Sequence, residues 1–274
     1  AHYHFELKKV FGNVPFIGEN VGSTTTPEEV ANVDASGNYV NIWQQIEDDM
    51  KFAADNLPAT QEGEVGRVNK WAAKAYLAKI YMFEGKYTDA KALLDDVIAN
   101  GSTSTGVKYA LAANYFSNFD PAGQNNSESV FLAQMSVNDG SGNAQGNDQG
   151  VSNGNYGDVL NFPYNNGPGG CCGFFNPSQS LANAYKTDAK GLPLLDTYNS
   201  GSAVDAHTSP YTGSLDPRID FVMGRPGIPY LDWGPVATDD SWLRNDQGSN
   251  GRFVPKKNVY SKSTQGTNSS TENY

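Results

Sequence analysis

Residues 77–97 read LAKIYMFEGKYTDAKALLDDV, and small and large apolar side chains recur along them at helical spacing. This pattern predicts two amphipathic helices joined by a tight turn at Gly85, where a residue without a Cβ has the backbone freedom that the turn requires. Ala78 is small enough to let the second helix approach the first, and Ala90 lets the return helix pack back. The segment therefore predicts a helical hairpin.

Eight positions of this hairpin keep the spacing of a tetratricopeptide repeat, a helix–turn–helix unit of about 34 residues. They are Leu77, Ala78, Tyr81, Gly85, Tyr87, Ala90, Leu94 and Val97. Tyr81 and Tyr87 are expected to fill the angle between the two helices. The repeat's usual Trp position holds Lys74, and Trp71 lies about one turn earlier. One such unit cannot bury both of its faces, so neighbouring helices are required.

Segments before the hairpin are candidates for these neighbours. Residues 39–56 are predicted to form a helix with an apolar seam made of Ile42, Ile46, Met50, Ala53 and Leu57. A shorter helix is predicted at the start of the chain, with an apolar face made of Tyr3, Leu7, Val10 and Phe11. No capping residue precedes this helix, so we expect the chain to be cut inside it. A further helix start is predicted at residues 26–29.

The helical periodicity is lost after Gly101. Residues 109–119 fit a short helix or a turn, and residues 129–135 fit a buried strand or an extended segment. Residues 139–170 are rich in Gly, Asn, Asp and Ser but also hold aromatic residues, which predicts a long ordered surface loop. A short helix is predicted at residues 177–185.

These elements predict a mainly α fold in which a tetratricopeptide-like scaffold carries a large irregular region. We place the scaffold, truncated at its N-terminus, in residues 1–100 and the loop-rich region, packed on it as one integrated fold, in residues 101–274. The 274 residues include 19 basic and 30 acidic side chains, a net charge of −11. An acidic chain without a Lys/Arg cluster is a poor nucleic-acid binder. Two cysteines, Cys171 and Cys172, are too few for a disulfide scaffold, and their redox state stays open.

No motif of metal-binding or catalytic chemistry is complete. His2 and His4 lie two residues apart and so fall on different faces of a helix, which disfavours joint metal ligation. Residues 139–150 resemble a calcium loop only superficially, because the sixth position is Ala144 and the twelfth is Gly150. No stretch approaches the roughly 18 apolar residues that a bilayer span requires. We therefore expect no metal, no cofactor and no catalytic residue.

Aromatic residues in the loop-rich region are the candidate ligand contacts. They lie beside Gly, Pro and Asn rather than on helical stripes: Tyr164, Phe174, Phe175, Tyr230, Trp233 and Trp242. Flat rings next to amide side chains suit a sugar, whose C–H faces pack on the rings while its hydroxyls take hydrogen bonds. The same rings could instead form a second core beneath the loops, and the sequence leaves both alternatives open.

Short motifs follow one another along the chain in a recognisable order. They are FGNVP at residues 11–15, the hairpin at residues 66–100, NSESVF at residues 126–131, FFNPSQSL at residues 174–181, DPRID at residues 216–220 and GRPGIPYLDWG at residues 224–234. In this order they resemble the SusD/RagB family, the nutrient-binding outer-membrane lipoproteins of Bacteroidetes. The resemblance covers nearly the whole chain, while about half of the length of an ordinary family member, with its lipoprotein cysteine, is absent.

The resemblance implies a mostly helical fold that captures an oligosaccharide or another nutrient, without catalysis or a cofactor. It also implies a partner, a SusC-like TonB-dependent transporter, and an extracellular location on the outer membrane through a lipid anchor outside this chain. Two alternatives are kept. One is a helical glycoside hydrolase with an acid pair such as Asp220 and Asp232. The other is a repeat scaffold whose only ligands are proteins or peptides.

Overall fold

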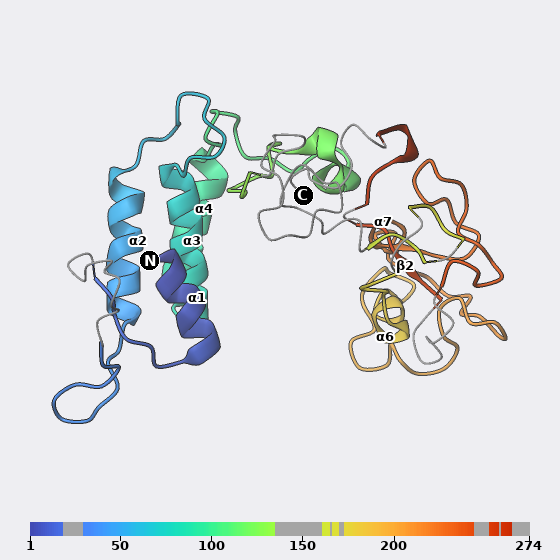
Figure 1. Ribbon diagram of the computed structural model, residues 1–274, viewed down its shortest axis with the longest axis horizontal. Helices are drawn as coiled ribbons and strands as arrows, with labels where there is room; N and C mark the ends of the chain where they lie inside the picture. The colour runs from blue at the N-terminus through green and yellow to red at the C-terminus, as the bar shows by residue number, and fades with distance from the viewer. Residues whose placement is uncertain are drawn as a thin grey trace, which may run out of the picture. The chain divides into compact units, whose positions relative to one another are not determined.

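The computed structural model describes residues 1–18, 30–134, 161–164, 166–169, 173–243, 252–257 and 259–264. The chain divides into two compact units, coloured along the chain in Figure 1. Unit 1 comprises residues 1–111 and 125–132, and unit 2 comprises residues 112–124 and 133–274. The predicted helix start at residues 26–29, most of the loop predicted at residues 139–170, and Cys171 and Cys172 lie outside the described residues. The single integrated fold stays a prediction.

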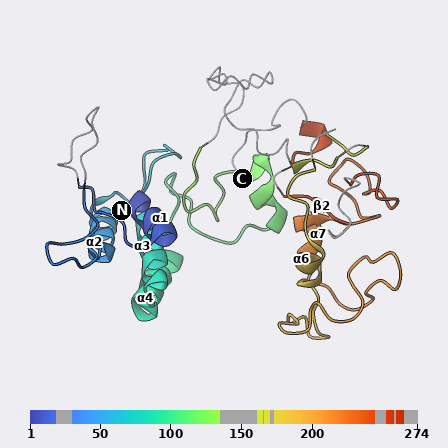
Figure 2. The ribbon, with the colours of Figure 1, turned by 60° about the horizontal axis from the view of Figure 1, so that its bottom comes forward.

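Unit 1 is helical in its described residues. Its helices are α1 (His2–Phe11), α2 (Trp43–Asn56), α3 (Lys70–Phe83) and α4 (Tyr87–Asn100). α3 packs against both α2 and α4, and α1 packs against α2 (Figure 1 and Figure 2). The predicted mainly α fold class is confirmed. The tetratricopeptide-like detail stays a prediction, with which the α3–α4 hairpin is consistent.

α3 begins at a residue that joins three segments of unit 1. Asn69 is 1% exposed, and its Oδ1 accepts a hydrogen bond from the N–H of Ala72, which caps the helix. Its Nδ2 donates to the carbonyl oxygens of Ala59, at 3.0 Å, and Ser102, at 2.8 Å. The cap of α3 therefore also holds the segment that precedes α3 and the segment that follows α4.

The hairpin buries most of the side chains that its sequence pattern selects. The buried ones are Leu77, Ala78, Ala90 and Val97. Tyr81 is half-buried against the core of unit 1, and Leu94 is half-buried on α4. Tyr87 is 67% exposed, so the prediction that it fills the angle between the helices is wrong. Tyr87 is the first residue of α4, and the Tyr81 ring lies at the turn instead, 5.6 Å from the Lys86 ammonium.

Gly85 forms the turn, and a substitution there tests the hairpin. Its φ is +76°, in the left-handed region that glycine adopts freely. A Cβ at this position would meet no heavy atom within 4 Å, so the cost comes from backbone strain alone. Gly85→Val is expected to lower the free energy of unfolding by about 1–2 kcal/mol in urea melts. Gly85→Asn is the control because asparagine tolerates this region better, and a Val variant as stable as the parent would contradict the expectation.

α1 forms as predicted but turns a different face inward. Phe5 is fully buried, and its ring centre lies 5.6 Å from that of Tyr76 and 5.2 Å from that of Phe83. The face predicted to be buried is exposed instead: Tyr3 80%, Leu7 44%, Val10 73% and Phe11 69%. The predicted seam of α1 is therefore wrong, because insertion of the Phe5 ring among the rings of α3 sets the rotation of the helix.

α2 keeps its predicted seam and starts later than predicted. Ile42, Ile46 and Met50 are buried, and Ala53 and Leu57 pack against the same core. The helix begins at Trp43 rather than at residue 39. The preceding residues are extended, because Val33 and Tyr39 pair in an antiparallel bridge.

Two carboxylates share one lysine where α2 meets the hairpin turn. The Lys86 ammonium contacts Oε1 of Glu47 and lies 3.2 Å from Oε2 of Glu84. Burial raises the pKa of the Glu84 carboxyl above its usual value, and the neighbouring Glu47 adds to this shift while Lys86 opposes it. The folded chain therefore holds the Glu84 proton more tightly than the unfolded chain. Because of this, the contribution of Glu84 to stability falls as the pH rises through the raised pKa.

Glu84→Gln is expected to raise the melting temperature at pH 7, because it removes a carboxylate that the fold disfavours in its charged form. This gain in melting temperature should shrink as the pH falls, because the Glu84 carboxyl of the parent protein then becomes protonated. The control is Glu64→Gln, since Glu64 forms an exposed ion pair with Arg67 and such pairs contribute little. Thermal melts from pH 4 to pH 7 measure both, and a lower melting temperature for Glu84→Gln at pH 7 would refute the expectation.

Unit 2 is built from short elements in its described residues. They are the α-helices α6 (Gln179–Asn183) and α7 (Ile219–Val222), the 3-10 helices η1 (Tyr115–Phe119), η2 (Pro121–Gly123) and η3 (Lys262–Thr264), and the strands β1 (Met223–Gly224) and β2 (Val254–Pro255). β1 pairs antiparallel with β2, with Met223 opposite Pro255. Because α7 runs directly into β1, this pairing brings the α7 region beside the chain that surrounds β2.

The segment predictions after Gly101 have different outcomes. The helix predicted at residues 177–185 is the shorter α6, whose first turn is capped by Ser178 Oγ. η1 lies in the segment for which a short helix or a turn is predicted. In residues 129–134 the chain forms no strand, and Phe131 is 51% exposed, so the buried strand is wrong, while the extended alternative stays a prediction. No described helix has the length and apolar character that crossing a bilayer requires.

Candidate functional site

Three of the six predicted ligand contacts lie in one aromatic core of unit 2. Tyr230 is fully buried, burial raises its pKa, and its Oη donates a 2.5 Å hydrogen bond to the carbonyl of Pro255. The prediction that Tyr230 contacts a ligand is therefore wrong, since its ring and its hydroxyl are both satisfied inside the protein. Trp242 meets the Tyr230 ring edge-on at 5.7 Å, and Trp233 Nε1 donates to the carbonyl of Tyr260 at 2.9 Å. Both tryptophans are half-buried, and a ligand role for them stays a prediction.

Phe174 and Phe175 form an exposed pair of rings. They are 47% and 75% exposed, and their ring centres lie 6.4 Å apart. Phe175 has a φ of +59°, a conformation that is strained for a bulky side chain. Tyr164, the sixth predicted contact, is half-buried, and its N–H donates to the carbonyl of Trp242. The structure thus does not gather the six predicted residues into one exposed surface.

A second aromatic group, which the sequence analysis missed, lies between η1 and α7. We call it the Tyr115 cluster, and its members are Tyr115, Phe116, Phe119, Phe221 and Lys257. All five side chains are half-buried, so each keeps part of its surface open to solvent. Three come from η1, one from α7 and one from the chain that follows β2, so the β1–β2 pairing is what assembles the group.

The rings of the Tyr115 cluster contact one another closely. The centre of the Tyr115 ring lies 5.3 Å from that of Phe119 and 5.8 Å from that of Phe221, both edge-on. Phe116 stacks on Phe221 at 6.1 Å. The Lys257 ammonium lies over the rings, 4.1 Å from the centre of Phe119 and 5.7 Å from that of Tyr115. These separations are those of favourable aromatic and cation–π contacts.

Polar groups stand at the edge of the Tyr115 cluster. Arg218 is paired with Asp216: its Nε donates to Oδ1 and Oδ2, both at 3.0 Å, and its Nη2 donates to Oδ2 at 2.5 Å. Burial raises the pKa of Tyr185, and Arg218 opposes this shift. Arg218 immediately precedes α7, which carries Phe221, and the backbone N–H of Asp216 donates to the carbonyl of Tyr185 at 2.8 Å. The cluster combines flat apolar faces with hydroxyl, guanidinium and ammonium donors, which is a composition that can bind a sugar.

The acid pair of the hydrolase alternative is held by other groups. Asp220 accepts from Nε of Arg225 at 2.7 Å. Asp232 accepts from the backbone N–H groups of Lys262, at 2.5 Å, and Ser263, at 2.8 Å. Burial acts to raise the pKa of Asp232, but these hydrogen bonds together hold the pKa below its usual value. A general acid of a glycosidase needs a raised pKa, so Asp232 is unsuited to that role.

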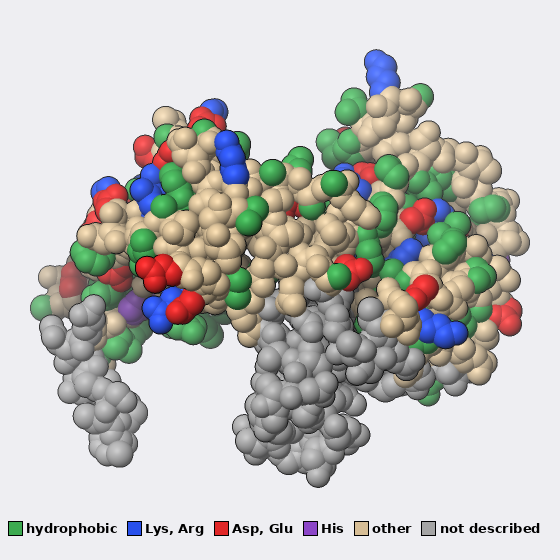
Figure 3. Space-filling view, turned by 90° about the horizontal axis from the view of Figure 1, so that it is seen from above, with side chains coloured by type: hydrophobic (Ala, Val, Ile, Leu, Met, Phe, Trp, Pro, Cys, Tyr) green, Lys and Arg blue, Asp and Glu red, His purple; other side chains and the backbone are tan. Residues whose placement is uncertain are grey.

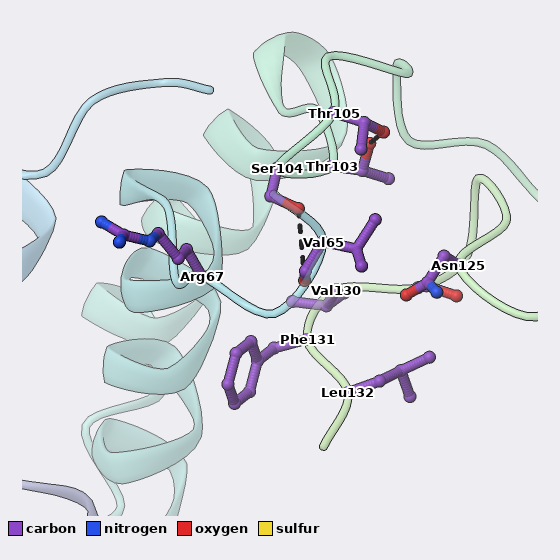
Figure 4. Close-up of a pocket in the computed structure, with 10 residues that line it drawn as sticks. Val65, Arg67, Thr103, Ser104, Thr105, Asn125, Val130, Phe131 and Leu132 are labelled. Carbon is purple, nitrogen blue, oxygen red and sulfur yellow. Dashed lines mark hydrogen bonds between the residues drawn. The ribbon is translucent and has the colours of Figure 1, made fainter. Parts of the chain in front are cut away.

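Two hollows lie in the described part of unit 1, and each differs from a sugar site, the first in its size and the second in its lining. The one in Figure 4 has a volume of only about 10 Å³, room for about one water, and its lining includes Phe131 and Arg67 as well as the hydroxyls of Thr103 and Thr105, which lie 2.9 Å apart. The other has a volume of about 460 Å³ and lies along the α3–α4 hairpin. Its lining is mainly apolar: Ala75, Leu94, Val97, Ile98, Tyr109, Ala110, Leu111, Ser127, Glu128 and Val130.

The histidines and acidic side chains form no metal site within the described residues. His2 Nδ1 lies 2.6 Å from the hydroxyl of Tyr76, whereas His4 Nε2 accepts from the N–H of Ile17, so the two imidazoles face different partners. Among the described side chains, no three of His, Cys, Asp or Glu gather closely enough to hold a metal ion. On the face shown in Figure 3, basic and acidic side chains are interspersed rather than segregated.

The sequence of the chain matches known families in two segments. Residues 127–274 match the family described as "SusD family", and residues 1–82 match a family described as "Starch-binding associating with outer membrane". A SusD-like protein of Bacteroides ovatus is 28% identical over 142 residues, an alignment that covers 48% of this chain and 24% of that protein.

Solved structures share the fold. A SusD-like protein of Bacteroides fragilis aligns with a TM-score of 0.63 at 20% identity, over 100% of this chain and 52% of that one. A SusD-like carbohydrate-binding protein of the same species aligns with a TM-score of 0.65 at 19% identity, over 99% of this chain and 49% of that one. The chain thus spans about half the length of these structures and about a quarter of the curated relative.

Proposed function

The chain belongs to the SusD family, and from this membership we propose that it takes part in binding an oligosaccharide or a related nutrient and leaves the ligand chemically unchanged. Proteins of this family are non-catalytic binding proteins associated with the outer membrane. The hydrogen bonds that occupy Asp220 and Asp232 support a role in binding rather than in hydrolysis.

The Tyr115 cluster is the observation that carries this proposal. A sugar presents a C–H face that packs on an aromatic ring and hydroxyls that need donors and acceptors. The cluster offers both kinds of contact in one place, from residues that three separate parts of unit 2 hold in position. The exposed pair of Phe174 and Phe175 is the second candidate surface.

The partner and the location of the full-length protein are also part of the proposal. We infer that it stands on the extracellular face of the outer membrane, held by a lipid anchor, and passes its ligand to a SusC-like TonB-dependent transporter. The exposed apolar face of α1 and the large hollow along the hairpin are surfaces of unit 1 on which protein contacts can form. Because of these surfaces, protein binding by the helical scaffold is a second candidate function.

A polysaccharide affinity gel with product analysis tests the proposal. The protein should be retained by at least one glycan of a panel and should release no reducing ends after prolonged incubation. Tyr115→Ala is expected to weaken binding about tenfold, which corresponds to about 1.4 kcal/mol. Tyr39→Ala is the control, since Tyr39 is an exposed tyrosine of unit 1. If the Tyr115→Ala variant is retained on the gel as strongly as the parent protein, the Tyr115 cluster is not the binding site. If reducing ends are released, the protein is a glycoside hydrolase.

A further inference from the structure

Lys257 is a cation without a carboxylate partner in the described part of the protein. Its ammonium contacts aromatic rings, and it forms no ion pair with an Asp or Glu side chain among the described residues. Nearby Arg218 differs, because three hydrogen bonds to the carboxylate of Asp216 already balance its charge. The Tyr115 cluster therefore holds one positive charge that its own neighbours leave unbalanced.

The position of Lys257 makes this charge effective toward a ligand. The side chain is half-buried against the rings of Phe119 and Tyr115, so it is partly withdrawn from water. A charge that is partly removed from water interacts more strongly with an opposite charge than a fully hydrated one. A protein with a net charge of −11 repels polyanions in general, so an anionic ligand would be drawn to this local cation rather than to the surface as a whole.

We propose that the Tyr115 cluster binds an acidic sugar, whose carboxylate or sulfate pairs with the Lys257 ammonium while its ring packs on the aromatic faces. This inference rests on the proposed function and specifies its substrate class. Lysine presents a compact point charge, which suits either anionic group. The ammonium lies over the Phe119 ring, 4.1 Å from its centre and 5.7 Å from that of Tyr115, so a sugar that packs on the neighbouring rings brings its anionic group within reach of Lys257.

Matched glycans that differ only in charge test the inference. The probes are polygalacturonate and its methyl ester, and chondroitin sulfate and its desulfated form, so that the carboxylate and the sulfate are examined separately. The protein is expected to bind at least one acidic probe about tenfold more tightly than the neutral counterpart. Lys257→Gln should abolish this preference and leave the weaker binding of the neutral probe in place. Lys257→Arg, which keeps the charge, should retain the preference.

The control variant is Lys190→Gln, since Lys190 is an exposed lysine of the same unit. Circular dichroism confirms that each variant is folded. Neutral probes bound as tightly as acidic ones, or a preference that survives Lys257→Gln, would overturn the inference and leave the proposed function standing. Failure of every charged and neutral glycan to bind would overturn the proposed function together with the inference.

Discussion

Phe5→Ala is expected to lower the free energy of unfolding of unit 1 by about 3–5 kcal/mol, the usual cost of removing a large buried aromatic side chain. Phe5 is fully buried, and its ring meets those of Trp43, Tyr76 and Phe83 edge-on or tilted at 5.2–6.1 Å. The Lys9 ammonium also lies 4.8 Å from its centre. Alanine would leave a cavity among these three rings, and it would remove the buried ring by which α1 packs on the core of unit 1.

Tyr3→Ala is the matched control for Phe5→Ala. Tyr3 lies on the same helix, carries a ring of similar size and is 80% exposed, so its loss is expected to change stability by no more than about 0.5 kcal/mol. Urea melts followed by circular dichroism measure both variants. A larger loss for Tyr3→Ala than for Phe5→Ala would show that the buried face of α1 is the one that the apolar pattern selects, and that the observed rotation of the helix is wrong.

The rotation of α1 shows why the sequence predicts some features of this fold and not others. In the α3–α4 hairpin the partner helix is the next element in the chain, so the spacing of Ala78, Gly85 and Ala90 specifies both helices and their contact. In α1 the apolar residues occupy more than one face, and the partner that selects Phe5 lies far along the sequence. Periodicity predicts that a helix forms there, but it does not show which face of the helix is buried.

The sequence does not predict the Tyr115 cluster, and the reason is related. The aromatic residues of η1 were visible as Tyr115, Phe116 and Phe119, at the spacing of a short helix. Phe221 and Lys257 join them only because α7 and the chain after β2 are brought together by a pairing of two residues per strand. Conversely, Tyr230 looks like a loop aromatic because it stands between Pro229 and Leu231, and no local feature indicates that its hydroxyl bonds the carbonyl of Pro255.

Tyr230→Ala is expected to lower the free energy of unfolding of unit 2 by about 3–5 kcal/mol. The ring packs against Trp242, and its Cδ2 lies only 2.8 Å from the point where a Cβ on Gly224 would stand, so the space around it is filled. Tyr230→Phe keeps the ring and removes only the hydroxyl that bonds the carbonyl of Pro255. It is expected to lower stability by about 1–3 kcal/mol, the cost of leaving a buried polar group without its partner.

Glycan binding separates this structural role of Tyr230 from a role in the ligand site. Well below its melting temperature, Tyr230→Phe should bind glycans as tightly as the parent protein, because a side chain that is fully buried cannot touch a ligand. Tyr115→Ala should show the opposite behaviour, with weaker binding and a smaller loss of stability, since Tyr115 is only half-buried. Affinity gels run beside thermal melts give both quantities for each variant. Reduced glycan retention by a folded Tyr230→Phe variant would indicate that Tyr230 contacts the ligand, and it would contradict the position of this side chain in the core.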